Sequence, residues 1–198
     1  MEYIVKNIQG FNDNDIKSFY ERIPKIKRDK INKIKNSNAR KRSIVGEILL
    51  SKLLTKNNLS YDNLEYYIND YGKPYLKNNN LFFNISHSFD YVIAIVSEKE
   101  IGIDIEKLRK TSLNTIHQFA TKKEQDYILS SNINIEERIF SIYTLKEAYI
   151  KMLGTNLNKA FDVEFQIINN TVICSDKNVK VGFLNDIEGY VIAYCERI

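Results

Sequence analysis

At the centre of the chain stands the stretch Gly102-Ile103-Asp104-Ile105-Glu106, which has the alternation of a β-strand. Successive side chains of a strand point to opposite faces, so the isoleucines share one face and the two carboxylates share the other, about 7 Å apart. Gly102 lies on the carboxylate face and is expected to leave room beside the acids. This pattern predicts a site for a hard divalent cation with one side open to substrate. The alternative is the polar face of an ordinary half-exposed strand.

The elements expected on either side of this strand follow the same order twice. In the first half, the patterns predict a strand at 2–8, helices at 12–21 and 38–57, and strands at 64–68, 81–85 and 91–96. In the second half, they predict a strand at 101–106, short helices within 112–129, a long helix at 135–153, and strands in an antiparallel meander at 163–168, 172–174, 180–184 and 190–195.

This order predicts an α+β fold made of two similar halves, residues 1–100 and 101–198, each with an antiparallel sheet packed against a long helix. We find no residue-level repeat between the halves, so the pseudo-twofold arrangement is inferred from element order alone. The cleft between the halves is the expected active site.

The composition is that of a folded, water-soluble protein. Of the 198 residues, 43% are hydrophobic and 27% are charged, which excludes extended disorder and a collagen-like chain. No apolar run reaches the roughly 18 residues of a membrane helix, and no export signal is recognised. Two cysteines, Cys174 and Cys195, cannot build a disulfide framework, and no Cys/His spacing suits zinc. We therefore expect a cytoplasmic protein without membrane contact.

Positive charge is concentrated in one segment of the first half. Ten basic residues and the single acid Asp29 lie between Arg22 and Arg42, although the net charge of the whole chain is only +4. Such a segment attracts phosphates, nucleic acids or an acidic partner protein. From charge alone, a solvated surface helix remains an equal alternative.

The long helix of the second half carries a polar face. Tyr143, Glu147 and Lys151 are spaced four residues apart and therefore lie on one side of the helix. A glutamate four residues before a lysine also stabilises an isolated helix by about 0.2–0.5 kcal/mol, so an ordinary surface pair explains this spacing equally well.

Two further patterns lie in the first half. An aromatic strand ends in Ser86-His87-Ser88, and Arg42 precedes Gly46 by one helical turn. A lone histidine near a strand end is more often structural than catalytic, and no Ser/His/Asp partner set accompanies it, which excludes a hydrolase triad. A glycine inside a helix costs roughly 1 kcal/mol relative to alanine, which is tolerable where a neighbour approaches closely.

The order of these motifs resembles that of one enzyme family. Along the chain follow Arg-x-x-x-Gly, Gly-Lys-Pro, Phe-Asn-Ile-Ser-His-Ser, Gly-Ile-Asp-Ile-Glu-Lys and Leu-Lys-Glu-Ala-Tyr-Ile-Lys. Together they resemble the 4′-phosphopantetheinyl transferases of the surfactin-synthetase-activating type, over residues 27–151. The resemblance implies two similar α+β halves. It also implies transfer of 4′-phosphopantetheine from coenzyme A to a serine of an apo acyl or peptidyl carrier protein, with release of adenosine 3′,5′-bisphosphate.

The resemblance also implies roles for individual residues. Asp104, Glu106 and Glu147 correspond to the acids that bind Mg²⁺ with the coenzyme A pyrophosphate. The positions expected near the nucleotide and phosphates are Lys27, Lys30, Arg42, Lys73, Pro74, Ser86, His87, Lys146 and Lys151. Glu147, Glu124 or a water on the metal would take the serine proton, and Lys151 would stabilise the departing bisphosphate. Tyr143 stands where the family usually has tryptophan.

The implied partners are coenzyme A and an acidic carrier protein, with Mg²⁺ as cofactor and no nucleic acid. One chain forms the whole cleft, so we expect a monomer. Leu113, Ile116 and Phe119 are either an apolar docking stripe for the carrier or part of the core.

Two other classes of function remain open. A metal-dependent nuclease would also use strand carboxylates, but its Glu-x-Lys spacing is missing because Glu106 and Lys107 are adjacent. A basic nucleic-acid-binding module is supported only by the segment between Arg22 and Arg42.

Overall fold

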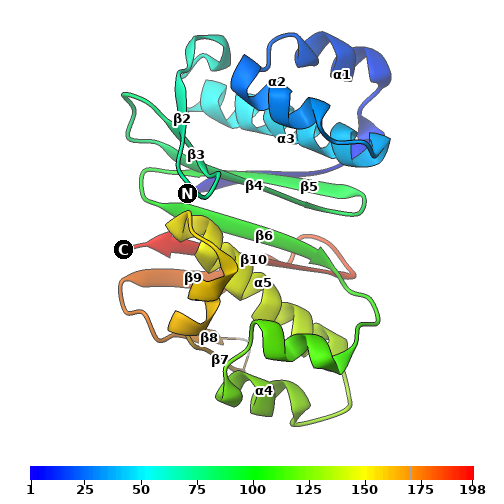
Figure 1. Cartoon of the computed structure of the whole chain (residues 1–198), viewed down its shortest axis with the longest axis vertical. Helices are drawn as coiled ribbons and strands as arrows, with labels where there is room; N and C mark the ends of the chain where they lie inside the picture. The colour runs from blue at the N-terminus through cyan, green and yellow to red at the C-terminus, as the bar shows by residue number, and fades with distance from the viewer. Residues whose placement is uncertain (170) are drawn as a thin grey trace.

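The computed structural model describes residues 1–169 and 171–198 and consists of two halves stacked on each other (Figure 1). The first half contains β1 (Glu2–Asn7), η1 (Ile8–Gly10), α1 (Asp13–Tyr20), α2 (Lys25–Asn32), α3 (Ser37–Lys56), η2 (Tyr61–Asn63), β2 (Tyr66–Ile68), β3 (Pro74–Leu76), β4 (Phe82–Ser88) and β5 (Tyr91–Ser97). The second half contains β6 (Ile101–Lys107), η3 (Leu113–Gln118), α4 (Lys122–Leu129), α5 (Ile135–Leu153), η4 (Leu157–Asp162), β7 (Phe165–Ile168), β8 (Thr171–Cys174), β9 (Val179–Phe183) and β10 (Tyr190–Arg197).

The two halves share one topology. The first sheet has the strand order β1-β5-β4 and the second has β6-β10-β9, so in each half the opening strand pairs with the last one. Each half also has a small two-stranded sheet, β2-β3 or β7-β8, which follows the long helix in sequence. All these pairs are antiparallel. The expected α+β fold of two similar halves is confirmed.

Capping residues define an end of each of the two long helices. Helix α3 is capped by Asn36, whose side chain accepts a hydrogen bond from the Ala39 N–H. Helix α5 ends at Gly154, which has φ +64°, the left-handed conformation that glycine adopts without strain. The bounds of α5 are those predicted from the sequence.

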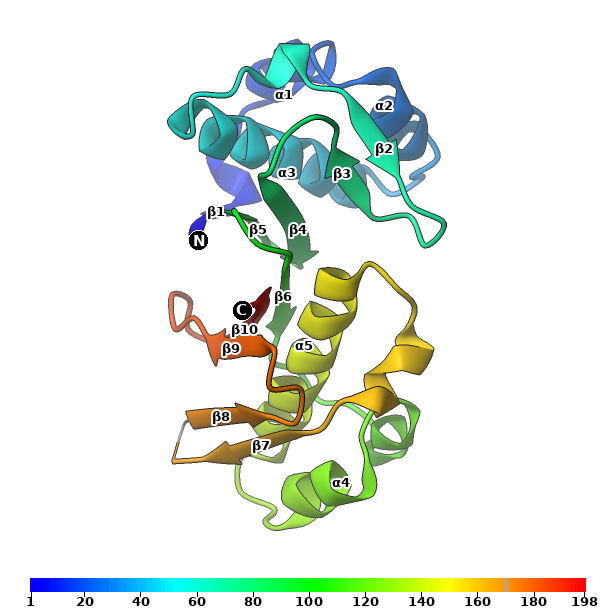
Figure 2. The ribbon, with the colours of Figure 1, turned by 90° about the vertical axis from the view of Figure 1, so that its left-hand side faces the viewer.

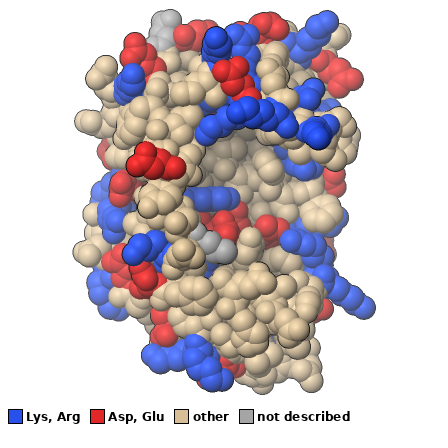
Figure 3. Space-filling view, viewed as in Figure 1, with Lys and Arg blue, Asp and Glu red and all other residues tan. Residues whose placement is uncertain are grey.

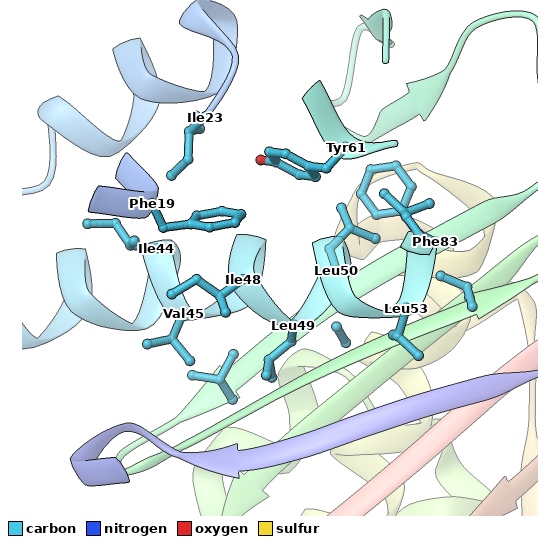
Figure 4. Close-up of a cluster of buried hydrophobic side chains, with 14 of the residues drawn as sticks. Phe19, Ile23, Ile44, Val45, Ile48, Leu49, Leu50, Leu53, Tyr61 and Phe83 are labelled. Carbon is cyan, nitrogen blue, oxygen red and sulfur yellow. The ribbon is translucent and has the colours of Figure 1, made fainter. Parts of the chain in front are cut away.

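Each half has its own hydrophobic core, and a third cluster joins the two. Figure 4 shows the first core, in which the apolar side chains of α3 pack beneath α1 and against the first sheet. The second core lies between α5, the second sheet and β7-β8. The third cluster is made of buried isoleucines from β5, β6 and β10: Ile93, Ile95, Ile101, Ile103, Ile105 and Ile192. Burial of this cluster holds the halves together.

The halves also meet through polar groups, because one face of β4 lies against an edge of β6. We call Asn84, Ser86 and Ser88 the β4 polar face. Their side-chain oxygens accept hydrogen bonds from the backbone N–H groups of Ile103, Ile105 and Lys107, respectively, at 3.0, 3.4 and 3.2 Å. The other edge of β6 pairs with β10. Side chains thus satisfy N–H groups that an edge strand would otherwise leave without partners.

Several local expectations differ from the structure. Pro74 of the Gly-Lys-Pro motif begins β3, and helix α2, which lies in the basic segment, was not among the helices with predicted bounds. The last four strands do not form one meander, because β7-β8 is a sheet separate from β9-β10. In the described residues, no helix combines the length and apolar character needed to cross a membrane. The functional division of the chain at residue 100 stays a prediction.

Candidate functional site

The strand β6 presents its two acids toward helix α5, as the alternation predicts, but the expected room beside them is filled. A Cβ atom on Gly102 would lie 2.0 Å from the Ala148 carbonyl oxygen and 2.3 Å from the Met152 nitrogen, both backbone atoms of α5. The interpretation of Gly102 as space for a ligand is therefore wrong. The glycine instead lets α5 approach β6 closely, which brings the residues of the helix to the acids.

Asp104 is buried, and among the described residues only one of its oxygens has hydrogen-bond partners. Its Oδ1 accepts hydrogen bonds from the Ser86 hydroxyl at 2.7 Å and from the Lys151 ammonium at 2.5 Å. Its Oδ2 is buried and has no hydrogen-bond partner among the described residues. A buried carboxylate oxygen without a partner is costly, and it is therefore a candidate ligand atom.

Glu106 is held in the same manner. Its Oε2 accepts hydrogen bonds from the Ser88 hydroxyl at 3.0 Å and from Arg109 Nη1 at 2.9 Å. Arg109 is exposed and lies over the Phe140 ring, 4.6 Å from its centroid. Neither Ser88 nor Arg109 was predicted as part of the site.

Glu147 on α5 is a third carboxylate, near enough to the two acids of β6 to be affected by their charges. Desolvation raises the pKa of Glu147, and the negative charges of Asp104 and Glu106 raise it further, whereas Lys151 opposes them. The expected Tyr143/Glu147/Lys151 face of α5 therefore points to the acidic strand. A cation among the three acids would relieve their mutual repulsion.

These residues fit Mg²⁺ in their chemistry. Hard cations take carboxylate oxygens, and Asp104 supplies an oxygen without a partner. No group of three or more His, Cys, Asp or Glu side chains is assembled as a metal cluster in the described part of the chain. Lys151 instead donates to Asp104, so metal binding would require this ammonium to move away from that oxygen.

Arg42 and His87 form a second part of the site, in which Arg42 carries the positive charge. Arg42 Nη1 donates to the carbonyl oxygen of Phe89 at 3.0 Å, while its buried Nε has no partner within residues 1–169 and 171–198. His87 is exposed, yet the atoms packed around its ring lower its pKa, and the charge of Arg42 lowers it further. Arg42 offers an anion N–H donors and a positive charge, and the His87 ring offers at least one N–H donor in either protonation state.

The Gly-Lys-Pro turn has an additional structural role. Lys73 is buried, and its ammonium donates to the carbonyl oxygens of Met152 at 2.6 Å and Ile101 at 3.3 Å. Burial lowers its pKa to about 8. Asn69 in the same turn donates to the Gly154 carbonyl oxygen at 2.7 Å. In Figure 2 the β2-β3 hairpin lies over the end of α5, which these bonds cap from the other half.

Of the remaining residues expected near the nucleotide, two lie at this hairpin. Pro74 pairs with Ile68 at the start of β3. Lys30 is exposed, and its ammonium lies 3.4 Å from the Gly72 carbonyl oxygen. Lys30 thus donates to the hairpin from the surface of the first half.

Lys27 lies in the core of the first half, not in the site. Its buried ammonium donates to Glu47 at 2.8 Å and lies 4.1 Å from the centre of the Tyr66 ring. Burial lowers its pKa, and Glu47 opposes that effect. In this conformation Lys27 anchors α2 to α3, which does not fit the expected contact with the nucleotide.

Lys146 and Glu124 are likewise buried, as an ion pair of 2.8 Å in which both side chains are 0% exposed. Lys146 also donates to the carbonyl oxygens of Ala160 and Val163, and Glu124 accepts from the Phe165 N–H. Desolvation lowers the pKa of Lys146, and Glu124 opposes this. The pair ties α4 and α5 to η4 and β7, and its burial does not fit the expected roles in phosphate binding and proton removal.

The apolar residues considered as a docking stripe for the carrier, Leu113, Ile116 and Phe119, are divided between the surface and the core. Leu113 is 45% exposed, whereas Ile116 and Phe119 are buried. A cavity of about 190 Å³ lies beside Phe119, lined also by Tyr143 and Arg109.

One face of the molecule is hollowed between the halves. Figure 3 shows acidic side chains at the floor of a hollow between the halves, with a row of lysine and arginine side chains along its upper rim. A floor of acids beneath a basic rim suits a polyanion bound together with a cation.

Two families match consecutive parts of this chain. Residues 12–100 match the family described as 4′-phosphopantetheinyl transferase, N-terminal, and residues 100–195 match the 4′-phosphopantetheinyl transferase superfamily.

Curated proteins of similar sequence are also named 4′-phosphopantetheinyl transferases. The chain is 34% identical to 4′-phosphopantetheinyl transferase gsp of Aneurinibacillus migulanus over 118 residues, which are 59% of this chain and 49% of that protein. It is 28% identical to 4′-phosphopantetheinyl transferase Sfp of Bacillus subtilis (strain 168) over 139 residues, or 69% and 62% of the two chains. The matched region thus spans about half to three fifths of these relatives.

Among solved structures, the holo-[acyl-carrier-protein] synthase of Thermotoga maritima aligns with a TM-score of 0.42 and 24% identity, over 50% of this chain and 62% of that one.

Proposed function

Because the chain belongs to the 4′-phosphopantetheinyl transferase superfamily, we propose that it transfers 4′-phosphopantetheine from coenzyme A to a serine hydroxyl of an apo carrier protein. The observation that carries this proposal is the gathering of Asp104, Glu106 and Glu147 beside Lys151, with one buried carboxylate oxygen left without a partner in the described residues. The comparisons do not favour a nuclease or a nucleic-acid-binding module.

In the reaction, the serine oxygen bonds to the pyrophosphate phosphorus that carries the pantetheine arm. The bond from that phosphorus to the bridging oxygen breaks, and adenosine 3′,5′-bisphosphate leaves with the electron pair. The serine proton goes to a carboxylate. Glu147 suits this role, since its raised pKa makes its ionised form a stronger base.

Asp104, Glu106 and Glu147 are the residues that would hold Mg²⁺. When bound, the ion would offset the negative charge of the pyrophosphate. Lys151 supplies a second positive charge on the neighbouring turn of α5, where it stabilises charge that grows on the leaving group. Glu124 is not the preferred base, because it is sealed in the ion pair with Lys146.

Arg42 and His87 bind the 3′-phosphate of the nucleotide in this proposal. The first half, residues 1–100, thus contacts the nucleotide, and the second half, residues 101–198, holds the metal and the catalytic helix. The carrier is an acidic protein, which the basic rim of the hollow would attract. The enzyme acts as a monomer in the cytoplasm.

Mass measurement of an intact carrier tests the function directly. The protein is incubated with coenzyme A, Mg²⁺ and an apo carrier, and the carrier is expected to gain the mass of one phosphopantetheine group. A carrier with its acceptor serine replaced by alanine is the control, and addition of a chelator is expected to stop the transfer. An unchanged carrier mass with several acidic carriers would refute the proposal.

A further inference from the structure

Two serines of the β4 polar face make the same pair of hydrogen bonds, two residues apart. Ser86 accepts from the Ile105 N–H and contacts Asp104 Oδ1, whereas Ser88 accepts from the Lys107 N–H and contacts Glu106 Oε2. Each hydroxyl therefore lies between a backbone N–H of β6 and the carboxylate of the preceding residue.

The direction of these bonds follows from the chemistry of the groups. A hydroxyl has one hydrogen, a backbone N–H can only donate, and an ionised carboxylate can only accept. Because the N–H occupies a lone pair of each serine oxygen, the single hydrogen is directed to the carboxylate. Each serine thereby has a defined orientation, and it fixes the carboxylate relative to the backbone of β6.

The bonds reach one oxygen of each acid. Ser86 and Lys151 both contact Oδ1 of Asp104, and Ser88 and Arg109 both contact Oε2 of Glu106. Oδ2 of Asp104 stays buried and without a partner among the residues described. Each carboxylate is thus held through one oxygen, and in Asp104 the second oxygen is the candidate ligand atom.

Asn84 provides an internal comparison on the same face. It accepts a hydrogen bond from the Ile103 N–H, as the serines do from their N–H groups, but Ile103 is not preceded by an acid. A side-chain hydrogen-bond acceptor on β4 is therefore sufficient to bond β4 to a backbone N–H of β6. The hydroxyl groups add a donor at the two rungs where β6 carries a carboxylate.

The geometry points to Ser88, to which the sequence motifs gave no role, as a positioning residue that orients Glu106 for cation binding, with Ser86 acting in parallel on Asp104. This inference rests on the proposed function, because it concerns the metal site of that reaction. Groups that orient metal-ligating carboxylates typically change metal affinity by about tenfold to hundredfold when they are removed. We therefore expect Ser88→Ala to weaken metal binding by that factor.

Ser97 offers a matched control for this substitution. It lies on β5 opposite Phe82, at the other end of the β4-β5 pair from Ser88. Its buried hydroxyl donates to a carboxylate of the other half, Glu196, at 2.5 Å. Ser97→Ala thus removes the same chemical bond across the same junction, but far from the acids of β6.

The test is a titration with Mn²⁺ followed by electron paramagnetic resonance, with coenzyme A present and no carrier. Ser88→Ala is expected to raise the apparent dissociation constant for Mn²⁺ about tenfold to hundredfold, and Ser88→Thr, which keeps the hydroxyl, to restore it. Ser97→Ala is expected to bind Mn²⁺ as the wild type does. If Ser88→Ala does not fold, Ser88→Cys, which keeps the volume with a weak donor, is expected to show the same weakening.

Wild-type Mn²⁺ affinity in Ser88→Ala, or equal weakening in Ser97→Ala, would overturn the positioning role. Failure of the proposed function would be seen separately, as absence of transfer by the wild-type protein. The metal titration does not depend on transfer.

Discussion

The close approach of α5 to β6 can be tested with a single methyl group. In Gly102→Ala the new Cβ would lie 2.0 Å from the Ala148 carbonyl oxygen, 2.3 Å from the Met152 nitrogen and 2.9 Å from the Lys151 carbonyl carbon. All three are backbone atoms, so no side-chain rotation can relieve the overlap. The helix itself must move away from the strand.

The size of the movement follows from these distances. Ordinary contact begins at 3.4 Å, so the helix must shift by about 1.4 Å from the closest atom. The 2.5 Å bond between Lys151 and Asp104 would then lengthen beyond hydrogen-bond range. Overpacking of this kind costs about 3 kcal/mol, which for a chain of this size lowers the melting temperature by about 6–12 °C. A displacement of this order lowers turnover about a hundredfold.

Two other glycines provide graded controls. In Gly46→Ala the Cβ would lie 2.7 Å from Cγ2 of Ile85, a side-chain atom, and the gain in helix propensity of about 1 kcal/mol offsets the crowding. In Gly10→Ala the Cβ would meet nothing within 4 Å. Melting temperature and carrier-transfer turnover are measured for all three variants. The reasoning is refuted if Gly102→Ala melts and reacts like Gly10→Ala.

Three further predictions concern charged groups. Glu147→Gln should lower turnover at least about a hundredfold. A base must be ionised and burial raises the pKa of Glu147, so wild-type turnover should fall as the pH is lowered through that raised pKa. This acidic decrease should be absent from the pH profile of the variant. Recovery of wild-type turnover at high Mg²⁺ would make Glu147 a ligand only. Arg42→Ala should weaken coenzyme A binding about tenfold to hundredfold in calorimetry but leave dephospho-coenzyme A unaffected, and equal losses for both ligands would contradict the phosphate contact. Lys146→Met should destabilise the fold by about 3–5 kcal/mol because it strands the buried charge of Glu124, and Glu124→Gln added to it should restore part of the melting temperature; no loss in the single variant would contradict the buried pair.

Patterns that repeat along one element were predictable from the sequence. The apolar residues at helical spacing in 38–57 predicted helix α3, whose Val45 and Leu49 are buried, and the alternation in 102–106 predicted which face of β6 carries Asp104 and Glu106. Such patterns depend on the 3.6-residue and 2-residue periods of the backbone, which need no knowledge of the partner element.

Polar side chains were harder to assign, because a buried lysine and a ligand-binding lysine look alike in sequence. Lys27, Lys73 and Lys146 all bond to groups far away in the chain, so their roles depend on which segment packs beside them. The roles of Ser88 and Arg109 became apparent only from the hydrogen bonds that both donate to Glu106 in the structure. The polar face of β4 was a usable signal, since Asn84, Ser86 and Ser88 occupy alternate positions of the strand.

The sequence by itself determined the α+β class, the order of the elements, the acidic face of β6 and the face of α5 that carries Glu147 and Lys151. It did so because local periodicity and motif order are properties of neighbouring residues. Only the tertiary structure decided that the space beside Gly102 belongs to α5, that Lys146 and Glu124 neutralise each other in the core, and that β4 holds the acids of β6 through its serines. These outcomes depend on distances of a few ångströms between segments remote in sequence, and packing alone sets such distances.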